Sequence, residues 1–171
     1  VKRGLVLHPG ADHAGVVLVG DLGHRYDPPA RGADDVMWTR VDAAAAAPRD
    51  LDTAADKRAR GTVLLVAGSV GAAGAAVLTT NGALWSGAGL TTLACPAHVQ
   101  RVIAPVVPSA MTLPLRHQQE HVSADAVDQL GMAAEVDAVA AGPGLGPTDG
   151  TRAVVDHLRA TADRLVLDAD A

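Results

Sequence analysis

Two glycine-rich segments, each placed directly after a short apolar run, constrain the fold of this chain more than any other sequence feature. The first reads Val63-Leu-Leu-Val-Ala-Gly-Ser-Val-Gly-Ala-Ala-Gly74, and the second reads Asp137-Ala-Val-Ala-Ala-Gly-Pro-Gly-Leu-Gly146. A continuous apolar run is typical of a parallel strand covered on both faces, and a glycine-rich turn after it is typical of a strand leading into a helix. Such turns lie at the carboxyl edge of the sheet, where backbone N–H groups and helix N-termini hold anions. The sequence therefore predicts a site for a phosphate-bearing ligand.

Strand and helix patterns alternate from residue 61 to the end of the chain. We expect strands over residues 62–67, 90–94, 111–115, 137–141 and 165–167, and helices over residues 74–86, 97–103 and 148–162, with a further helix capped by Ser123. Small and apolar residues surround the helix at 74–86, so we expect it to be buried on all sides. This alternation predicts an α/β fold with a parallel, doubly covered sheet.

Composition narrows the class of protein. Apolar residues make up 49% of the 171 residues but aromatic residues only 2%, so valine, leucine and alanine must form the core. The lone Cys95 excludes an internal disulfide and is interpreted as a small buried hydrophobe. A net charge of −5 without a basic face argues against a nucleic-acid partner, and the lack of a long apolar run or a basic leader predicts a cytoplasmic protein with no membrane partner.

The chain divides into an irregular first part and a regular second part. Residues 24–35 mix proline, glycine and charge without a period, and residues 36–47 have the pattern of a short helix. Residues 26–60 are predicted to be a linker, and residues 61–171 are predicted to form the α/β domain. The chain stops after a strand, so we expect the domain to be incomplete at its C-terminus. Because an exposed sheet edge favours pairing, we also expect a homo-oligomer.

Five blocks of sequence, in this order and spacing, resemble the ADP-dependent NAD(P)H-hydrate dehydratase family: Gly61-Thr-Val-Leu-Leu-Val-Ala-Gly-Ser69, Gly74-Ala-Ala76, Ser86-Gly-Ala-Gly-Leu90, Gly142-Pro-Gly-Leu-Gly146 and Leu167-Asp-Ala-Asp-Ala171. The resemblance implies a ribokinase-like fold. It also implies dehydration of hydrated NADH or NADPH back to the active cofactor, coupled to cleavage of ADP or ATP with Mg²⁺. Residues 1–25 are similar to the tail of the NAD(P)H-hydrate epimerase domain that precedes the dehydratase in bifunctional members.

The resemblance also implies site residues. One side of the pocket for the hydrated cofactor would be formed by Gly68, Ser69, Gly74, Ala75 and Ala76, and the other side by Gly142, Gly144 and Gly146. We expect an open cradle between these two segments, so that Gly144→Val would abolish binding and leave the fold intact. Asp168 and Asp170 would lie near the phosphates and the metal, with both carboxylates on one side of the last strand.

The chain departs from the family pattern at several points. Ala72 replaces an aromatic residue, and Arg58 replaces a glycine after Lys57. The family's Thr-Pro-His-Pro-Gly, Lys-Gly and Gly-Thr-Gly-Asp motifs are expected beyond residue 171, so no catalytic residue is assigned and the chain alone is expected to be inactive. His117 and His121 have the spacing of a metal pair but lack a third ligand, so we predict no protein metal site. Two alternatives remain open: a ribokinase-fold vitamin-precursor kinase and a non-catalytic binding module.

Overall fold

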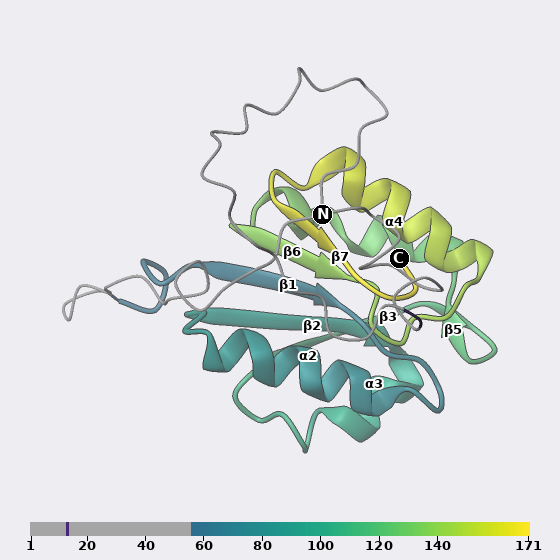
Figure 1. Ribbon diagram of the computed structural model, residues 1–171, viewed down its shortest axis with the longest axis horizontal. Helices are drawn as coiled ribbons and strands as arrows, with labels where there is room; N and C mark the ends of the chain where they lie inside the picture. Colours follow the sequence, from purple (N-terminus) through teal and green to yellow (C-terminus); the bar gives the residue numbers. More distant parts are fainter. Residues whose placement is uncertain (1–12, 14–55) are drawn as a thin grey trace. The chain divides into compact units, whose positions relative to one another are not determined.

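A five-stranded parallel sheet forms the centre of the domain (Figure 1). The computed structural model describes His13 and residues 56–171, so the predictions for residues 1–25 and most of the linker lie outside the described residues. The strands are β1 (Thr62–Val66), β2 (Leu90–Pro96), β3 (Met111–Leu115), β6 (Ala138–Ala141) and β7 (Leu165–Leu167), in the order β3-β2-β1-β6-β7. All four pairings are parallel. The predicted α/β fold is therefore confirmed.

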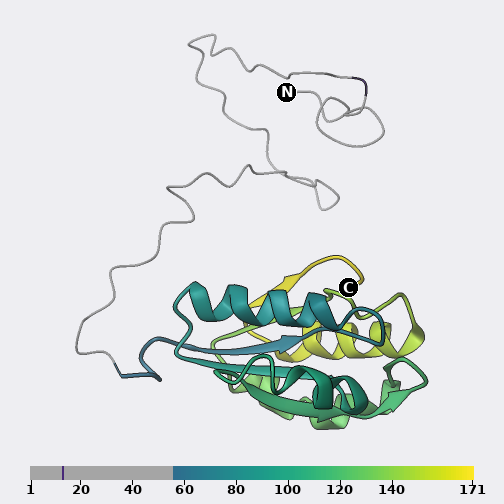
Figure 2. The same ribbon diagram turned by 90° about the horizontal axis from the view of Figure 1, so that it is seen from below.

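Helices cover both faces of this sheet. Figure 1 shows α2 (Ala73–Trp85) and α3 (Ala97–Ile103) on one side and α4 (Asp149–Thr161) on the other, and Figure 2 shows α2 running alongside β1. Two 3₁₀ helices, η2 (Ala124–Gln129) and η3 (Gly131–Ala134), join α4 on its face. No helix in residues 56–171 is long and apolar enough to cross a membrane.

The core consists of aliphatic side chains on each side of the sheet. Alternate residues of a strand point to opposite faces, so Leu64 packs with the cluster under α4 and Leu65 packs with the cluster under α2 and α3. No phenylalanine, tyrosine or tryptophan belongs to either cluster, as the composition predicted. Cys95 is fully buried in β2, and this burial raises the pKa of its thiol to about 11. The thiol is accordingly a packing group.

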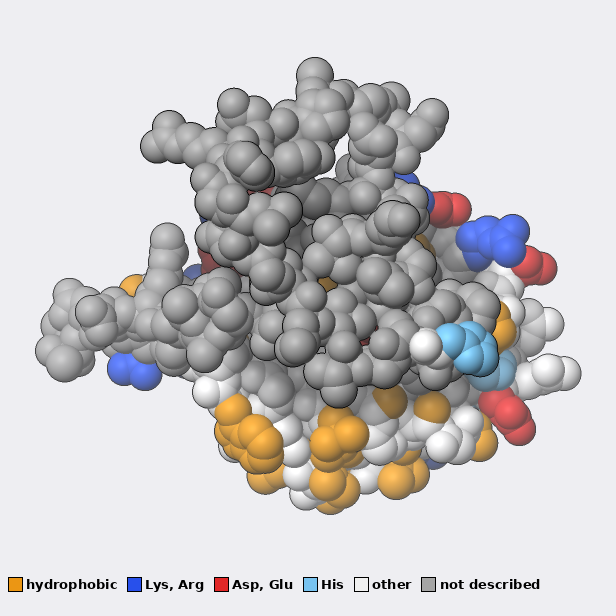
Figure 3. All heavy atoms as spheres, viewed as in Figure 1, with side chains coloured by type: hydrophobic (Ala, Val, Ile, Leu, Met, Phe, Trp, Pro, Cys, Tyr) orange, Lys and Arg blue, Asp and Glu red, His pale blue; other side chains and the backbone are white. Residues whose placement is uncertain are grey.

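Helix α2 differs from its prediction, because it is buried on one side only. Ala76 and Thr80 face the sheet, whereas Leu78 and Trp85 are 74% and 85% exposed. Small residues are enough to cover a sheet at close range, so the large apolar side chains of α2 are left on its outer face. Figure 3 shows hydrophobic side chains gathered over α2 and α3. The helix thus leaves an uncharged apolar surface in contact with solvent.

A polar clasp fixes the register between β1 and β6, the two strands that carry the glycine-rich segments. The Asp137 carboxylate accepts hydrogen bonds from the Thr62 amide (2.7 Å) and from the Thr62 hydroxyl (2.8 Å). These two donors hold the pKa of Asp137 below its ordinary value, because they favour the ionised carboxylate. The clasp aligns both strands at their amino ends, and so it also sets where their carboxyl ends lie.

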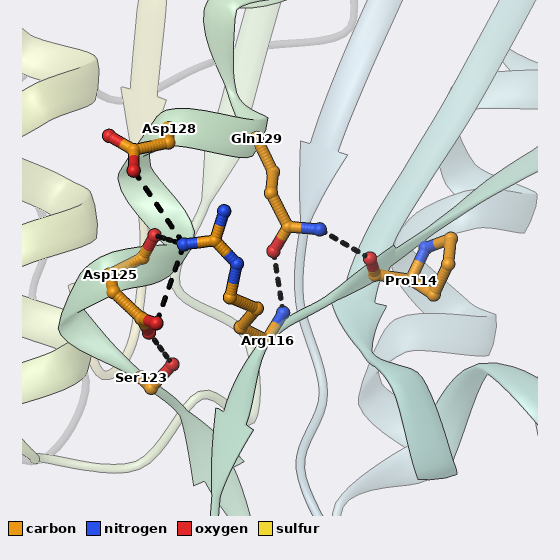
Figure 4. A network of polar contacts seen from close by, with 6 residues as sticks. All are labelled: Pro114, Arg116, Ser123, Asp125, Asp128 and Gln129. Atoms are coloured by element: carbon orange, nitrogen blue, oxygen red, sulfur yellow. Dashed lines mark hydrogen bonds and ion pairs between the residues drawn. The ribbon is translucent and has the colours of Figure 1, made fainter.

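The segment after β3 is tied to the sheet by side chains (Figure 4). The Gln129 amide group accepts from the Arg116 backbone (2.7 Å) and donates to the Pro114 carbonyl (3.1 Å), while the Arg116 guanidinium lies 3.4 Å from Asp125. Ser123 stands at the N-cap position of η2, as predicted. Its hydroxyl, however, donates to the Asp125 carboxylate and accepts no hydrogen bond from a backbone amide. That hydroxyl, with Arg116, holds the pKa of Asp125 below its usual range.

Candidate functional site

The two glycine-rich segments meet at the carboxyl edge of the sheet. We call residues 67–72, between β1 and α2, the first glycine loop, and residues 142–148, between β6 and α4, the second glycine loop. The Gly68 amide of the first loop donates to the Pro143 carbonyl of the second loop (2.9 Å), and the Gly142 amide donates to the Val66 carbonyl (3.2 Å). The expectation that both loops lie on one side of the molecule is therefore met, and they are in direct contact.

The space between the loops is closed. At Gly144, which has a φ of +70°, a Cβ atom would lie 2.8 Å from the Cβ of Ala72 and 2.9 Å from that of Ala75. At Gly68 a Cβ atom would lie 2.9 Å from the Cβ of Ala76. Gly68 and Gly144 thus allow the loops to pack on each other and on α2. The predicted open cradle between the loops is wrong, because alanine methyl groups already fill that space.

Two further predicted glycines also face protein atoms. A Cβ atom at Gly142, where φ is +130°, would overlap the backbone carbonyl of Asp168. A Cβ atom at Gly146 would lie 2.5 Å from the imidazole ring of His121. The absent side chains at these positions make room for the chain after β7 and for a histidine ring. The space beside Gly142 and Gly146 is thus filled by protein atoms and is not free for a ligand.

The open glycines lie instead at the start of α2. A Cβ atom at Gly71 or Gly74 would meet no atom within 4 Å, and both residues are exposed. Gly74 belongs to the predicted site, and Gly71 was missed although it stands in the same glycine-rich string and has a φ of +81°. Ser69, by contrast, is only 3% exposed, and its carbonyl closes the turn by accepting from the Ala72 amide (3.1 Å).

The N-terminus of α2 has no cap, and this distinguishes it from the N-terminus of α4. Its N-cap residue is Ala72, no acidic residue lies in its first turn, and the amides of Ala73 and Gly74 make no hydrogen bond to the described part of the chain. In α4 the Thr148 hydroxyl accepts from the Thr151 amide (3.1 Å), and Asp149 lies in the first turn. Free amides and a helix dipole together attract an anion. Of these two helix N-termini, only the N-terminus of α2 can therefore bind an anion.

The two aspartates after β7 do not share one side of a strand. The strand ends at Leu167, Ala169 has a φ of +53°, and the Ala171 amide donates to the Asp168 carbonyl (3.3 Å). The predicted placement on one side of the pleat is wrong, because the chain turns at Ala169. The Asp170 carboxylate instead accepts from the Gly146 amide of the second glycine loop (3.0 Å). The Gly146 amide, one of the backbone donors expected to bind phosphate, is therefore already bonded to the carboxylate of Asp170.

These carboxylates fit a metal ion only in part. Within residues 56–171 no group of three or more histidine, cysteine, aspartate or glutamate side chains could hold one. Magnesium in nucleotide sites is commonly bound by one or two carboxylates, with phosphate and water oxygens completing the octahedron. Asp168 and Asp170 are exposed at the edge that carries both loops, so they suit this minimal role.

Comparison with known proteins identifies the family. A sequence model of the NAD(P)H-hydrate dehydratase family matches residues 63–171. The chain belongs to the NAD(P)H-hydrate dehydratase family. The bifunctional NAD(P)H-hydrate repair enzyme Nnr of Dictyoglomus turgidum is 31% identical over 99% of this chain and 34% of its own length. The Nnr of Moorella thermoacetica is 37% identical over 99% of this chain and 33% of its own length. This member of the family thus spans about a third of the length of these relatives.

Solved structures share the fold of this domain. The ADP/ATP-dependent NAD(P)H-hydrate dehydratase of Bacillus subtilis, co-crystallised with ATP and Mg²⁺, is 34% identical with a TM-score of 0.58, over 71% of this chain and 42% of that one. A ribokinase-like superfamily protein of Enterococcus faecalis superposes with a TM-score of 0.57 at 23% identity, over 68% of this chain and 39% of that one. The ribokinase-like fold implied by the sequence blocks is confirmed.

Proposed function

We propose that this chain binds hydrated NADH or NADPH and serves in its dehydration back to the active cofactor, coupled to cleavage of ADP or ATP. The observation that carries the proposal is the uncapped N-terminus of α2 beside the two open glycines, Gly71 and Gly74. A cofactor phosphate placed there receives backbone N–H groups and the positive end of a 13-residue helix. Family membership favours this ligand over the precursor of a vitamin kinase.

The chemistry of the reaction explains why a nucleotide is needed. Hydroxide is a poor leaving group, whereas a phosphorylated hydroxyl leaves as phosphate with the C–O electron pair, and loss of a proton then restores the double bond. When Mg²⁺ is bound, it neutralises the charge on the nucleotide phosphates. Asp168 and Asp170 are the residues proposed to lie beside that ion. The remaining residues of the site hold the substrate, and we assign none of them a catalytic step.

The first test places a negative charge in the proposed phosphate site. We expect Gly74→Asp to weaken binding of hydrated NADPH by about tenfold relative to Gly74→Asn, because the two side chains have the same shape and differ in charge. The same aspartate should stabilise free α2 relative to asparagine, since a carboxylate in the first turn interacts favourably with the helix dipole. Calorimetric titration measures the affinity, and thermal unfolding measures the stability. Equal affinities in the two variants would show that no phosphate binds there.

We further propose that residues 1–25 are the end of an upstream epimerase-like domain and that residues 26–60 link it to the dehydratase part. Alignment of the two Nnr relatives with 99% of the chain supports this, because the matched region extends well before β1. Limited proteolysis provides the test. Cleavage concentrated within residues 26–60 is expected, and cleavage spread equally over residues 61–171 would contradict the division.

Self-association is proposed through the apolar face formed by Leu78 and Trp85 of α2 and by Val102 and Val106. These four side chains are 60% to 85% exposed, and α2 carries no charged residue, so the α2 part of this face is apolar and uncharged. We expect the Leu78→Lys, Trp85→Lys double variant to sediment as a monomer at concentrations where the unchanged chain is a dimer or larger. Val166→Lys, at an equally apolar position on β7, is the control. Identical sedimentation of the double variant and the unchanged chain would refute the proposal.

A further inference from the structure

A short hairpin contacts both glycine loops at once. It consists of β4 (His117–Gln118) and β5 (His121–Val122), paired antiparallel. The Glu120 carbonyl at its turn accepts from the Val70 amide of the first glycine loop (3.1 Å). The Nδ1 atom of His121 lies 2.8 Å from the Leu145 carbonyl of the second glycine loop. Glu120 in the turn and His121 directly after it therefore contact the first and the second glycine loop, respectively.

The contact made by His121 has a defined direction. A carbonyl oxygen only accepts hydrogen bonds, so Nδ1 carries the hydrogen and donates it to Leu145. The imidazole ring also covers Gly146, where a Cβ atom would lie 2.5 Å from Cε1 and 2.7 Å from Nδ1. Any larger residue at position 146 would push the ring away from Leu145. The glycine and the histidine thus form a matched pair.

The hairpin does not hold its own shape. Each strand has only two residues, and a hairpin of this length is not stable alone. Its turn also contains Gln119 at a φ of +52°, a left-handed conformation that is strained for a residue with a side chain. Contacts outside the hairpin must supply the difference, and those from Val70 and Leu145 lie directly beside the turn. Hairpin and loops therefore stabilise each other.

We propose that the hairpin is a strap that fixes the two glycine loops relative to each other, and that His121 is a positioning residue of the site. By holding the loops before the ligand arrives, the strap lowers the ordering cost of binding. The effect on affinity rests on the proposed function of the site, whereas the effect on loop rigidity does not. Hence the two can be measured separately.

The main experiment compares His121→Ala with His121→Asn in the full chain. Asparagine keeps an N–H donor near the position of Nδ1, and alanine removes it. We expect His121→Ala to raise hydrogen exchange about tenfold at the amides of Val70, Leu145, Gly146 and Thr148, with exchange in β1 and β2 unchanged. Affinity for hydrated NADPH should fall by a similar factor, and His121→Asn should recover most of both losses. Exchange in the two loops that is unaffected by His121→Ala would overturn the proposal.

A double-mutant cycle with Gly146→Ala tests the same contact even if single variants are poorly stable. The strain from a φ of +79° at position 146 is present with or without the histidine ring, and the steric overlap is present only with the ring. We expect the drop in unfolding midpoint caused by Gly146→Ala to be at least halved in the His121→Ala background, and equal drops in both backgrounds would contradict the strap. If the unchanged chain binds no hydrated NADPH but the cycle and the exchange show coupling, the proposed function fails and the strap stands.

Discussion

Replacing Gly142 by alanine is expected to cost about 3 kcal/mol or more of the free energy of unfolding, enough to unfold a marginally stable domain. The added methyl group would overlap the carbonyl oxygen of Asp168 and lie 2.9 Å from the Cβ of Ala171. The backbone at Gly142 and the backbone at Asp168 cannot move apart without breaking strand pairing, because the Asp168 amide donates to the Ala141 carbonyl (3.1 Å) where β6 pairs with β7. The φ of +130° at position 142 adds backbone strain.

Denaturant unfolding followed by far-ultraviolet circular dichroism measures this loss. The matched control is Gly74→Ala, which makes the same chemical change at a position with no atom within 4 Å of the new methyl group. In the first turn of α2 this control should raise the stability by a few tenths of a kcal/mol to about 1 kcal/mol, since alanine favours a helix more than glycine does. Equal stability of the two variants would mean that the chain after β7 does not pack on Gly142.

Gly144→Val is the second change with a large expected effect, and its mechanism differs from the one expected from sequence. Valine at this position would press on Ala72 and Ala75 and force the second glycine loop away from α2. A β-branched side chain at a φ of +70° is strained as well. We expect a loss of about 3 kcal/mol or more, so that ligand binding disappears together with the native fold.

A second-site variant separates packing from backbone strain. Ala72→Gly removes the methyl group closest to position 144, so Gly144→Ala should be less destabilising in that background than in the unchanged chain. Thermal unfolding of the four proteins of this cycle gives the coupling. A Gly144→Val chain that melts at the original temperature but binds no cofactor would instead restore the interpretation that position 144 faces the ligand.

The sequence predicted the sheet well because the signals for it are local. Apolar runs bounded by glycine marked β1 and β6, and the segment at 97–103 was predicted with the bounds that α3 has. The burial of α2 could not be predicted in the same way, since alanine, threonine and valine give almost no contrast between its two faces. The hairpin at 117–122 was missed because its strands show no alternation of polar and apolar residues. Contacts from distant segments hold it in place.

The sequence predicted where the two glycine loops of the candidate site lie, but it did not predict which of their residues are open to a ligand. Glycine patterns show where a chain needs conformational freedom or close approach, and they do not show which of the two is used. At Gly68 and Gly144 the need is packing against alanines, and at Gly71 and Gly74 it leaves space beside a helix end. The turn at Ala169, which separates Asp168 from Asp170, depends on a backbone conformation that alanine rarely adopts. The sequence therefore offered no reason to predict a turn there.

The position of Trp85 determines how this domain can be observed by fluorescence. It is the only aromatic residue between positions 56 and 171, and it is 85% exposed to water in the folded state. In a single copy of the domain, the indole emission of Trp85 should therefore change little on unfolding, whereas in the self-associated form proposed above it should change when the copies separate. The same indole becomes a sensitive optical probe of any event that covers the outer face of α2.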